Sequence, residues 1–402
     1  MAKTSGAETI EPEELIARAR ALRPVLRERQ ETAERNRRIS DETIADIRDA
    51  GLFRSLQPSY HGGLEVALDD ALRVIMEIAA GCGSTGWVFA VMAMHQWMIG
   101  MFPPACQDDV WGDGRGAVSA SSFPPVGEAV AVDGGWRLDG SWPFTSGCDN
   151  ADWIILGVRM FPAPGAEPTG QGYVIIPKGD YAIEDKWHVV GLAGTGSKDI
   201  VVDGAFVPGH RLLTLADALS GAPPGAARNT GPLYRIPFFA AISSGLCAPV
   251  LGMAQGVLDD YVAETTGRMT KGAAIAQPMP MAELPTIHLR VAEAAAAIDA
   301  ARLLLLRDCA ELMETVAERR PLTELHRARN KGDLGYAVRL AKQATDSLFE
   351  SAGGHALYSS GRLQRAWRDL HAGTMHISLN WDATGALYGR VMLGQPAGPA
   401  QF

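Results

Sequence analysis

The pattern of the sequence changes twice along the chain, and these two changes restrict the possible folds more than any other feature. From about Glu13 to Gly114 the apolar residues recur at helical spacing. From Gly116 to about Thr214, Gly-Gly and Asp-Gly turn signals separate alternating and β-rich runs. From about Phe238 to Arg390 the helical pattern returns in long Ala- and Leu-rich segments. A chain that separates its helices from its strands in this way is predicted to have an α+β fold.

The predicted domain boundaries follow the same pattern, and the 402 residues are more than a single core usually holds. The segment before the bundle is rich in Gly, Pro and Ala, which is typical of a linker. Within the bundle, a third helix is expected from about Gln364 to Leu379. We expect an N-terminal helical domain over residues 1–115, a central β-barrel or sandwich of antiparallel strands over 116–220, a linker over 221–240 and a C-terminal helical bundle over 241–402.

The most apolar segment of the N-terminal part is TGWVFAVMAMHQWMIGMF, residues 85–102. It is shorter than the roughly 20 residues that a membrane-spanning helix needs, and its centre is polar, so a buried helix is the better interpretation. Burying a histidine costs free energy unless its ring is paired. His95 is therefore a candidate functional residue, whereas Gln96 is expected to point away from its site because adjacent helical residues do not share a face.

The composition limits the kinds of partner. The formal net charge of −9 argues against nucleic acid and against anionic membranes, because an acidic surface attracts neither. The five cysteines are widely spaced and include no CxxC pair, so neither a disulfide framework nor a zinc site is expected. His371 and His376 are five residues apart, off the i,i+4 spacing of helical metal ligands, and we expect no metal. The N-terminus shows no apolar signal segment, so a cytoplasmic protein is expected.

Several polar residues stand in aromatic surroundings. Taken singly, each has a structural explanation, because a core histidine usually bonds to the backbone and a Ser or Thr before a turn usually caps it. The chain shows no Walker A, HExxH, GxSxG or GxGxxG motif, so these residues are the main candidates for a site. They are His95, Ser121, Ser122, Thr145, Ser146, Trp187, His188 and His376.

Four separated motifs contain most of these residues: CGSTGWVFAVMAMHQW, GSWPFTSGCDNADW, VVGLAGTGSKDIVV and QRAWRDLHAGTMH. In this order they resemble the oxygenase components of two-component, flavin-dependent aromatic monooxygenases, a group that includes the secosteroid phenol hydroxylase of cholesterol catabolism and the oxygenase of p-hydroxyphenylacetate hydroxylase. The resemblance covers almost the whole chain. It implies the acyl-CoA dehydrogenase fold, with a C-terminal four-helix bundle, and assembly as a homotetramer.

The resemblance also implies a flavin site between the β domain and the bundle, completed by a neighbouring subunit. It places Thr145, Ser146 and Trp187 along the isoalloxazine ring, and a glycine pair approaches from the next subunit. Arg268 is matched more loosely to the flavin phosphate. FMN and FAD stay open, because the flavin diffuses in as a substrate. The matched residues are Thr145, Ser146, Trp187, Arg268, Gly353 and Gly354.

The reaction implied by the resemblance uses reduced FMN or FAD, supplied by a separate NAD(P)H-dependent flavin reductase. The reduced flavin reacts with O2 to give a C4a-hydroperoxide, which hydroxylates an aromatic, phenolic substrate. Ser146 matches the residue that holds the flavin N5 proton, and His376 matches a histidine near C4a. His95 and Ser121 match the pair that binds the phenolic hydroxyl, where a base with a pKa near 7 suits removal of the phenol proton.

An apolar pocket should surround the substrate and exclude water. One departure from the family bears on it: Phe123 stands where the secosteroid hydroxylase carries a tyrosine, which argues against a steroid-derived substrate. The predicted pocket residues are Met94, Trp97, Phe123 and Trp142.

Three alternatives stay open. The same chemistry could oxygenate indole, another N-heterocycle or a sulfur compound. A true acyl-CoA dehydrogenase needs a carboxylate base, yet no Asp or Glu lies between Asp369 and Asp382. A non-catalytic flavin-binding protein of the same fold would use neither His95 nor Ser146 for chemistry.

Overall fold

The computed structural model describes residues 10–270 and 277–398. Its N-terminal part is helical, and α4 is its buried centre, with nearly every side chain out of contact with water. A glycine allows α4 to approach α3 closely, since a methyl group at Gly86 would lie 2.4 Å from the Cα atom of Ala79. The helices of this part are α1 (Pro12–Asn36), α2 (Asp41–Asp49), α3 (Leu68–Gly81), α4 (Gly83–Ile99) and α5 (Pro104–Trp111).

The central part is a mixed sheet of seven strands, in the order β5-β6-β2-β1-β3-β4-β7. The expectation of purely antiparallel strands is wrong, because β1 and β3 run parallel, with Ser121 opposite Ile155. The reason is that β2 forms a hairpin on one side of β1, and the chain then crosses the end of the sheet to pair β3 on the other side. The strands are β1 (Ser119–Val132), β2 (Gly135–Thr145), β3 (Trp153–Phe161), β4 (Gly170–Pro177), β5 (Ala182–Glu184), β6 (Lys198–Pro208) and β7 (Leu212–Thr214).

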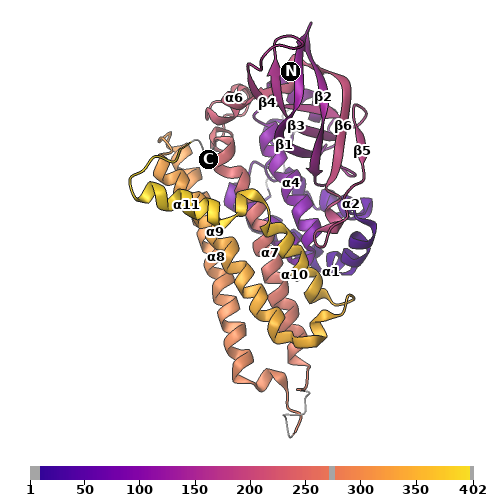
Figure 1. Cartoon of the computed structure of the whole chain (residues 1–402), viewed down its shortest axis with the longest axis vertical. Coiled ribbons are helices and arrows are strands. Elements are labelled where there is room, and N and C mark those ends of the chain that lie inside the picture. The colour runs from indigo at the N-terminus through magenta and orange to yellow at the C-terminus, as the bar shows by residue number, and fades with distance from the viewer. Residues whose placement is uncertain (1–9, 271–276, 399–402) are drawn as a thin grey trace.

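This crossing positions the site. The start of β1, the end of β2 and the start of β3 meet at one end of the sheet, and the crossing segment, residues 146–152, connects the last two. Figure 1 shows the sheet above the helical bundle, with α4 between them. Both the start of β1 and the crossing segment therefore lie where sheet, α4 and bundle come together.

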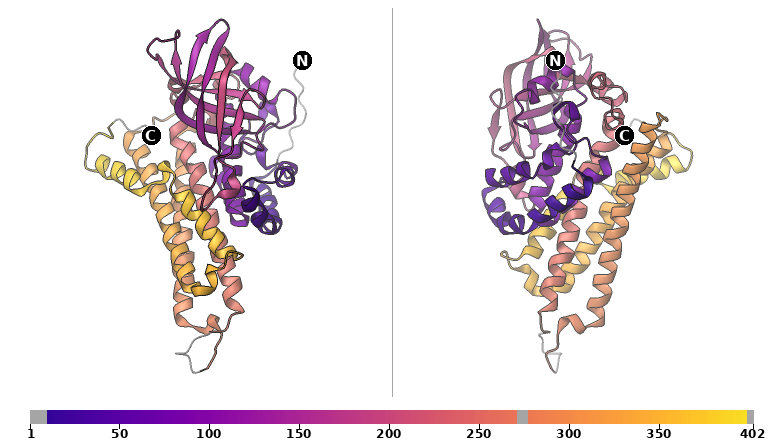
Figure 2. Two further views of the ribbon diagram at one scale, coloured as in Figure 1. Left: turned by 45° about the vertical axis from the view of Figure 1, so that its right-hand side comes forward. Right: turned by 180° about the vertical axis from the view of Figure 1, so that it is seen from behind.

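The C-terminal part is a bundle of long helices that follows the short helix α6 (Leu215–Leu219), and Figure 2 shows it extending away from the sheet. The helix α7 is long and apolar enough to cross a membrane, but 83% of its most apolar window is buried inside the protein, as in a core helix. The bundle comprises α7 (Phe238–Thr266), α8 (Pro285–Ala317), α9 (Glu324–Ala352), α10 (Arg362–Thr374) and α11 (Trp381–Met392).

The expected continuous helix over residues 364–379 is wrong. α10 ends at Thr374, and a short 3-10 turn, η9 (Ile377–Leu379), follows. His376 stabilises the end of α10 and the start of η9, because its Nδ1 atom accepts a hydrogen bond from the Ser378 backbone N–H at 3.2 Å. This is the side-chain capping that competes with helix continuation.

Candidate functional site

Two side chains from different elements form a buried hydrogen-bonded pair at the junction of α4 and β1. His95 of α4 is 1% exposed, and its Nδ1 atom lies 2.7 Å from the carbonyl oxygen of Ser119. Its Nε2 atom lies 2.8 Å from Oγ of Ser121. The structure thus brings together the two residues predicted to bind the substrate hydroxyl, although they are separated by 26 positions in the chain.

The protonation of this pair follows from the partners. A carbonyl oxygen only accepts, so His95 Nδ1 carries the hydrogen and Nε2 is free to accept one from the Ser121 hydroxyl. Burial lowers the pKa of His95 from 6.5 to about 4, although its bond to Ser119 opposes the shift. The expected pKa near 7 is therefore wrong for the free protein, because burial disfavours the imidazolium and, among residues 10–270 and 277–398, no anion compensates it. At neutral pH the ring is uncharged and ready to take a proton.

This low pKa predicts a pH-dependent stability. Since the unfolded chain protonates His95 before the folded one does, the stability tied to the neutral ring is present above about pH 6.5 and is lost as the pH falls toward 4. Between about pH 7 and about pH 4.5 we expect wild type to lose about 2–3 kcal/mol more unfolding free energy than His95→Gln. Denaturant unfolding at both pH values measures this difference, and equal losses in the two proteins would contradict the assignment.

Aromatic rings surround the pair on one side. Phe123 meets the His95 ring edge-on at 5.7 Å, and it meets Tyr173 and Phe238 in the same way at 5.5 and 5.2 Å. Trp97 stacks on Phe238 at 6.1 Å. Tyr173 and Phe238 were not predicted: β4 has five consecutive buried residues and so no alternation that singles out Tyr173, whereas Phe238 lies at the predicted start of the bundle. Together the rings form an apolar cluster beside His95, and two of its members, Trp97 and Phe123, belong to the predicted pocket.

The other two predicted pocket residues lie elsewhere in the core. Met94 packs against α7, where a methyl group at Gly245 would lie 2.3 Å from its Cγ atom. Trp142 lies within the sheet: its indole N–H donates to the Gly157 carbonyl at 2.8 Å, and its ring covers Gly127. Gln96 donates to the carbonyl of Ala117 at 3.1 Å, so it supports the approach to β1 rather than the His95 pair.

The predicted flavin residues Thr145 and Ser146 lie where β2 ends. The Thr145 hydroxyl is buried and has no hydrogen-bond partner among the described residues. Nearby, Trp187 is half-buried and donates its indole N–H to the Leu192 carbonyl at 3.1 Å, while Phe144 stands edge-on to it and is 69% exposed. A buried hydroxyl without a partner, next to exposed aromatic rings, fits a planar heterocycle such as isoalloxazine.

The remaining flavin candidates lie at the other end of the bundle. Both terminal nitrogens of Arg268 donate to the Ala352 carbonyl at 3.3 Å, which brings Arg268 next to Gly353 and Gly354. Figure 1 shows that the end of α7 and the end of α9, where these residues lie, point away from the sheet. Within one chain they are therefore far from Ser146.

The two late histidines differ in their surroundings. The His376 ring lies 6.2 Å from Trp87, and burial, followed by the charge of Lys331, lowers its pKa. His371 binds the Trp367 carbonyl at 2.7 Å and the Asp346 carboxylate at 3.0 Å, so it joins α10 to α9. His371 therefore has a structural role.

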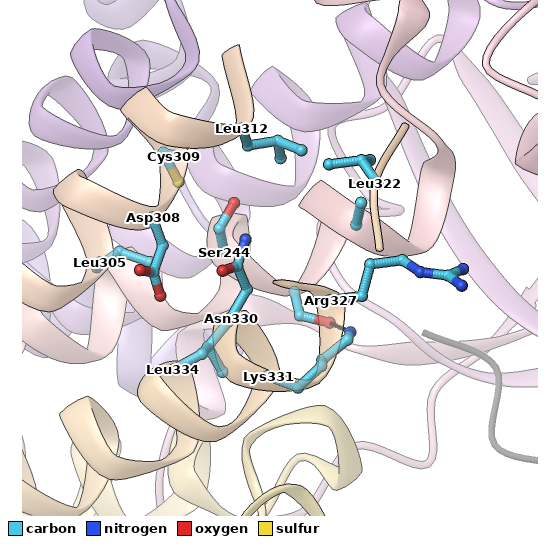
Figure 3. A pocket seen from close by; sticks show the side chains of 12 residues that line it. Ser244, Leu305, Asp308, Cys309, Leu312, Leu322, Arg327, Asn330, Lys331 and Leu334 are labelled. Carbon is cyan, nitrogen blue, oxygen red and sulfur yellow. Dashed lines mark hydrogen bonds between the residues drawn. The ribbon is translucent and has the colours of Figure 1, made fainter. Parts of the chain in front are cut away.

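Figure 3 shows a small cavity between α7, α8 and α9, which was not predicted from the sequence. Lys331 donates to the Ser243 hydroxyl there at 2.8 Å, and burial lowers the pKa of Lys331 to about 8. The cavity volume is about 30 Å³, which suits a single water molecule rather than an aromatic ring. It is a small void of the bundle, lined by both polar and apolar side chains, and it is too small to hold a phenol.

Comparisons with known proteins agree with this arrangement. The acyl-CoA dehydrogenase N-terminal domain matches residues 11–111, and the acyl-CoA dehydrogenase C-terminal domain matches residues 244–381. The oxygenase component of the FADH(2)-dependent resorcinol hydroxylase of Rhizobium sp. (strain MTP-10005) is 40% identical over 96% of this chain and 95% of its own length.

Two solved structures are also similar. The 3-HSA hydroxylase of Rhodococcus sp. RHA1 is 36% identical, with a TM-score of 0.90 over 95% of this chain and 97% of its own. XiaF from Streptomyces sp., solved in complex with FADH2 and glycerol, is 30% identical, with a TM-score of 0.89 over 97% of this chain and 98% of its own. The chain therefore belongs to the oxygenase components of two-component, flavin-dependent monooxygenases, which have the acyl-CoA dehydrogenase fold and work with a separate flavin reductase.

Proposed function

We propose that this oxygenase hydroxylates a small phenol. The observation that carries the proposal is the buried hydrogen-bonded pair of His95 and Ser121, placed against the ring of Phe123. A phenol offers a flat apolar ring for the aromatic cluster and one hydroxyl for the polar pair. The similarity to a resorcinol hydroxylase supports a phenolic substrate and makes resorcinol the first compound to test.

The polar pair can remove the phenol proton in two linked steps. The phenol O–H donates to Ser121 Oγ, whose own hydrogen is already directed at His95 Nε2. When the phenol proton moves to Ser121, the Ser121 hydrogen moves to His95, and the Ser119 carbonyl holds the opposite N–H of the imidazolium. The phenolate formed beside it compensates its charge, which opposes the desolvation that lowers the pKa of His95 in the free protein. Phenolate is a stronger carbon nucleophile than phenol.

When bound, reduced flavin would activate O2, and one oxygen atom of this O2 would pass to the ring of the phenol. Thr145 and Ser146 would face its ring system, and Trp187 would cover it. The aromatic rings beside His95 would exclude water from the phenol, and the neutral His376 would hold or return a proton of the bound flavin. FADH2 is the flavin we propose, on the strength of the FADH2-dependent relative and the FADH2 complex.

We further propose that the working form is a homotetramer in the cytoplasm. One chain leaves Arg268 and Gly353 at the far end of the bundle, so they can meet a flavin near Ser146 only if it is bound by another copy. Exposed apolar side chains accompany them, including Leu357 at 73% and Tyr358 at 67%, as expected of an interface. Sedimentation equilibrium tests the assembly, and a monomer at micromolar concentration would contradict it.

The function is tested by giving the protein reduced FAD, O2 and a panel of phenols and indoles, with NADH and a general flavin reductase as the source of reduced flavin. We expect a product heavier by one oxygen atom from at least one phenol, detected by mass spectrometry. Oxygenation of indoles with no turnover of any phenol would favour a heterocyclic substrate. Oxidation of NADH to hydrogen peroxide alone, with every compound, would contradict the proposal.

A further inference from the structure

Three buried hydroxyl groups, those of Thr195, Ser197 and Ser146, form a hydrogen-bonded row that ends at Ser146. Ser146 Oγ lies 2.7 Å from Ser197 Oγ, and Ser197 Oγ lies 2.6 Å from Thr195 Oγ1. Thr195 Oγ1 in turn lies 2.8 Å from the Leu192 carbonyl oxygen. All three side chains are at most 7% exposed.

The directions of these hydrogen bonds are fixed by counting hydrogens. Each distance is in the range of an O–H···O bond, so one hydrogen lies in each gap. The Leu192 carbonyl has no hydrogen to give, so the single hydroxyl hydrogen of Thr195 points to it. The gap between Thr195 and Ser197 must then be filled by the Ser197 hydrogen, and the gap between Ser197 and Ser146 by the Ser146 hydrogen.

These directions determine which kind of hydrogen bond Ser146 can make with a flavin. Its only hydrogen is directed back into the protein, so its oxygen can only accept from a group on the flavin side. The N5 atom of reduced flavin carries a hydrogen, whereas N5 of oxidised flavin carries a lone pair and needs a donor. A Ser146 that can only accept therefore favours the reduced cofactor over the oxidised one.

We propose that Thr195 and Ser197 are positioning residues that hold Ser146 as an acceptor and so make the site selective for reduced flavin; this rests on the proposed binding of flavin beside Ser146. The Thr195 end of the row binds Leu192, which also positions Trp187, the ring proposed to cover the flavin. The Leu192 carbonyl accepts from the indole of Trp187 as well, and the Leu192 N–H donates to the buried Asp369 of α10 at 2.6 Å. One carbonyl thus orders both Trp187 and the hydroxyl row.

Two variants test the direction of the row, and they should differ. In Ser197→Ala the Ser146 hydroxyl loses its acceptor and can rotate, so the preference for reduced flavin should weaken. In Thr195→Val the Ser197 hydrogen loses its acceptor and can turn only to Ser146, which makes Ser146 a donor toward the flavin. Valine has the shape of threonine, so this variant changes the hydrogen bonds with little change in packing.

The readout is binding, measured anaerobically by titration of the protein with reduced and with oxidised FAD. We expect the ratio of Kd for oxidised FAD to Kd for reduced FAD to fall about three- to tenfold in Ser197→Ala, the effect of one neutral hydrogen bond, and to fall further in Thr195→Val. Ser197→Thr and Thr195→Ser keep their hydroxyls and should keep the ratio. Thermal unfolding shows whether each variant is folded.

The outcomes separate the two proposals. A loss of packing alone would weaken both Kd values equally and leave the ratio unchanged, which would overturn the assignment of Thr195 and Ser197. If wild type hydroxylates a phenol and both variants keep its ratio, the row has no such role but the proposed function stands. If wild type binds neither form of flavin, both proposals fail.

Discussion

Replacing His95 with alanine is expected to lower the rate of phenol hydroxylation by about 10²–10⁴-fold, the usual contribution of a general base. The reason is that Ser121 loses the acceptor at 2.8 Å through which the phenol proton leaves. Reduced flavin should still be consumed at nearly the wild-type rate, because the residues proposed to bind it, Thr145 and Ser146, lie at the end of β2 and do not contact His95 in the cited hydrogen bonds. Oxygen uptake, product and hydrogen peroxide measured in the same reaction show whether oxygen consumption is separated from product formation.

Gln96→Ala is the matched control for this prediction. Gln96 is the next residue of α4, is equally buried and also bonds to a backbone carbonyl near β1, at Ala117. Its removal costs a comparable hydrogen bond without touching Ser121, so the variant should keep its ratio of product to hydrogen peroxide. Equal losses of product in the two variants would mean that His95 acts through the stability of α4 alone.

Replacing Glu34 with alanine is expected to lower the unfolding free energy by about 2–3 kcal/mol, because partly buried, charge-assisted hydrogen bonds to two arginines are lost. Glu34 of α1 binds Arg365 at 2.5 Å and Arg368 at 2.6 Å, both on α10. The Arg365 side chain is 5% exposed and would lose the carboxylate that it binds directly. Denaturant unfolding measures the change.

Glu14→Ala serves as the control, because Glu14 and Arg18 form an exposed i,i+4 pair on the same helix. Such pairs contribute about 0.3–0.5 kcal/mol. Arg368 also donates to the Val190 carbonyl at 2.6 Å, so loss of Glu34 should weaken flavin binding by loosening the loop that carries Trp187. A Glu34→Ala protein as stable as Glu14→Ala would show that the buried arginines find other compensation.

The sequence predicted the order of helical and β parts because helical periodicity and turn signals are local. It did not predict that β1 and β3 are parallel, since a turn signal does not tell on which side of the sheet the chain continues. His95 was identified because an ionisable ring in an apolar helix needs a partner. Its low pKa depends on complete burial in three dimensions, and the expected value near 7 was wrong for that reason.

The candidate flavin residues show the same limit. Thr145 and Ser146 followed from a resemblance, whereas Ser197 was not among the predicted site residues. Its importance depends on a contact across 51 positions of the chain. Similarly, Trp142 looked like a pocket residue from its neighbours in sequence, but its indole N–H binds inside the sheet. The assignment of roles to these residues stays a prediction.

Transfer of one oxygen atom from O2 to a phenol is the reaction proposed for this protein. The most direct test supplies chemically reduced FAD, without any reductase, to the protein and resorcinol under isotopically labelled oxygen gas. We predict a hydroxylated product that carries one labelled oxygen atom and depends on the protein. Product whose added oxygen comes from unlabelled water, or hydrogen peroxide as the sole product with resorcinol and every other phenol, would contradict the account.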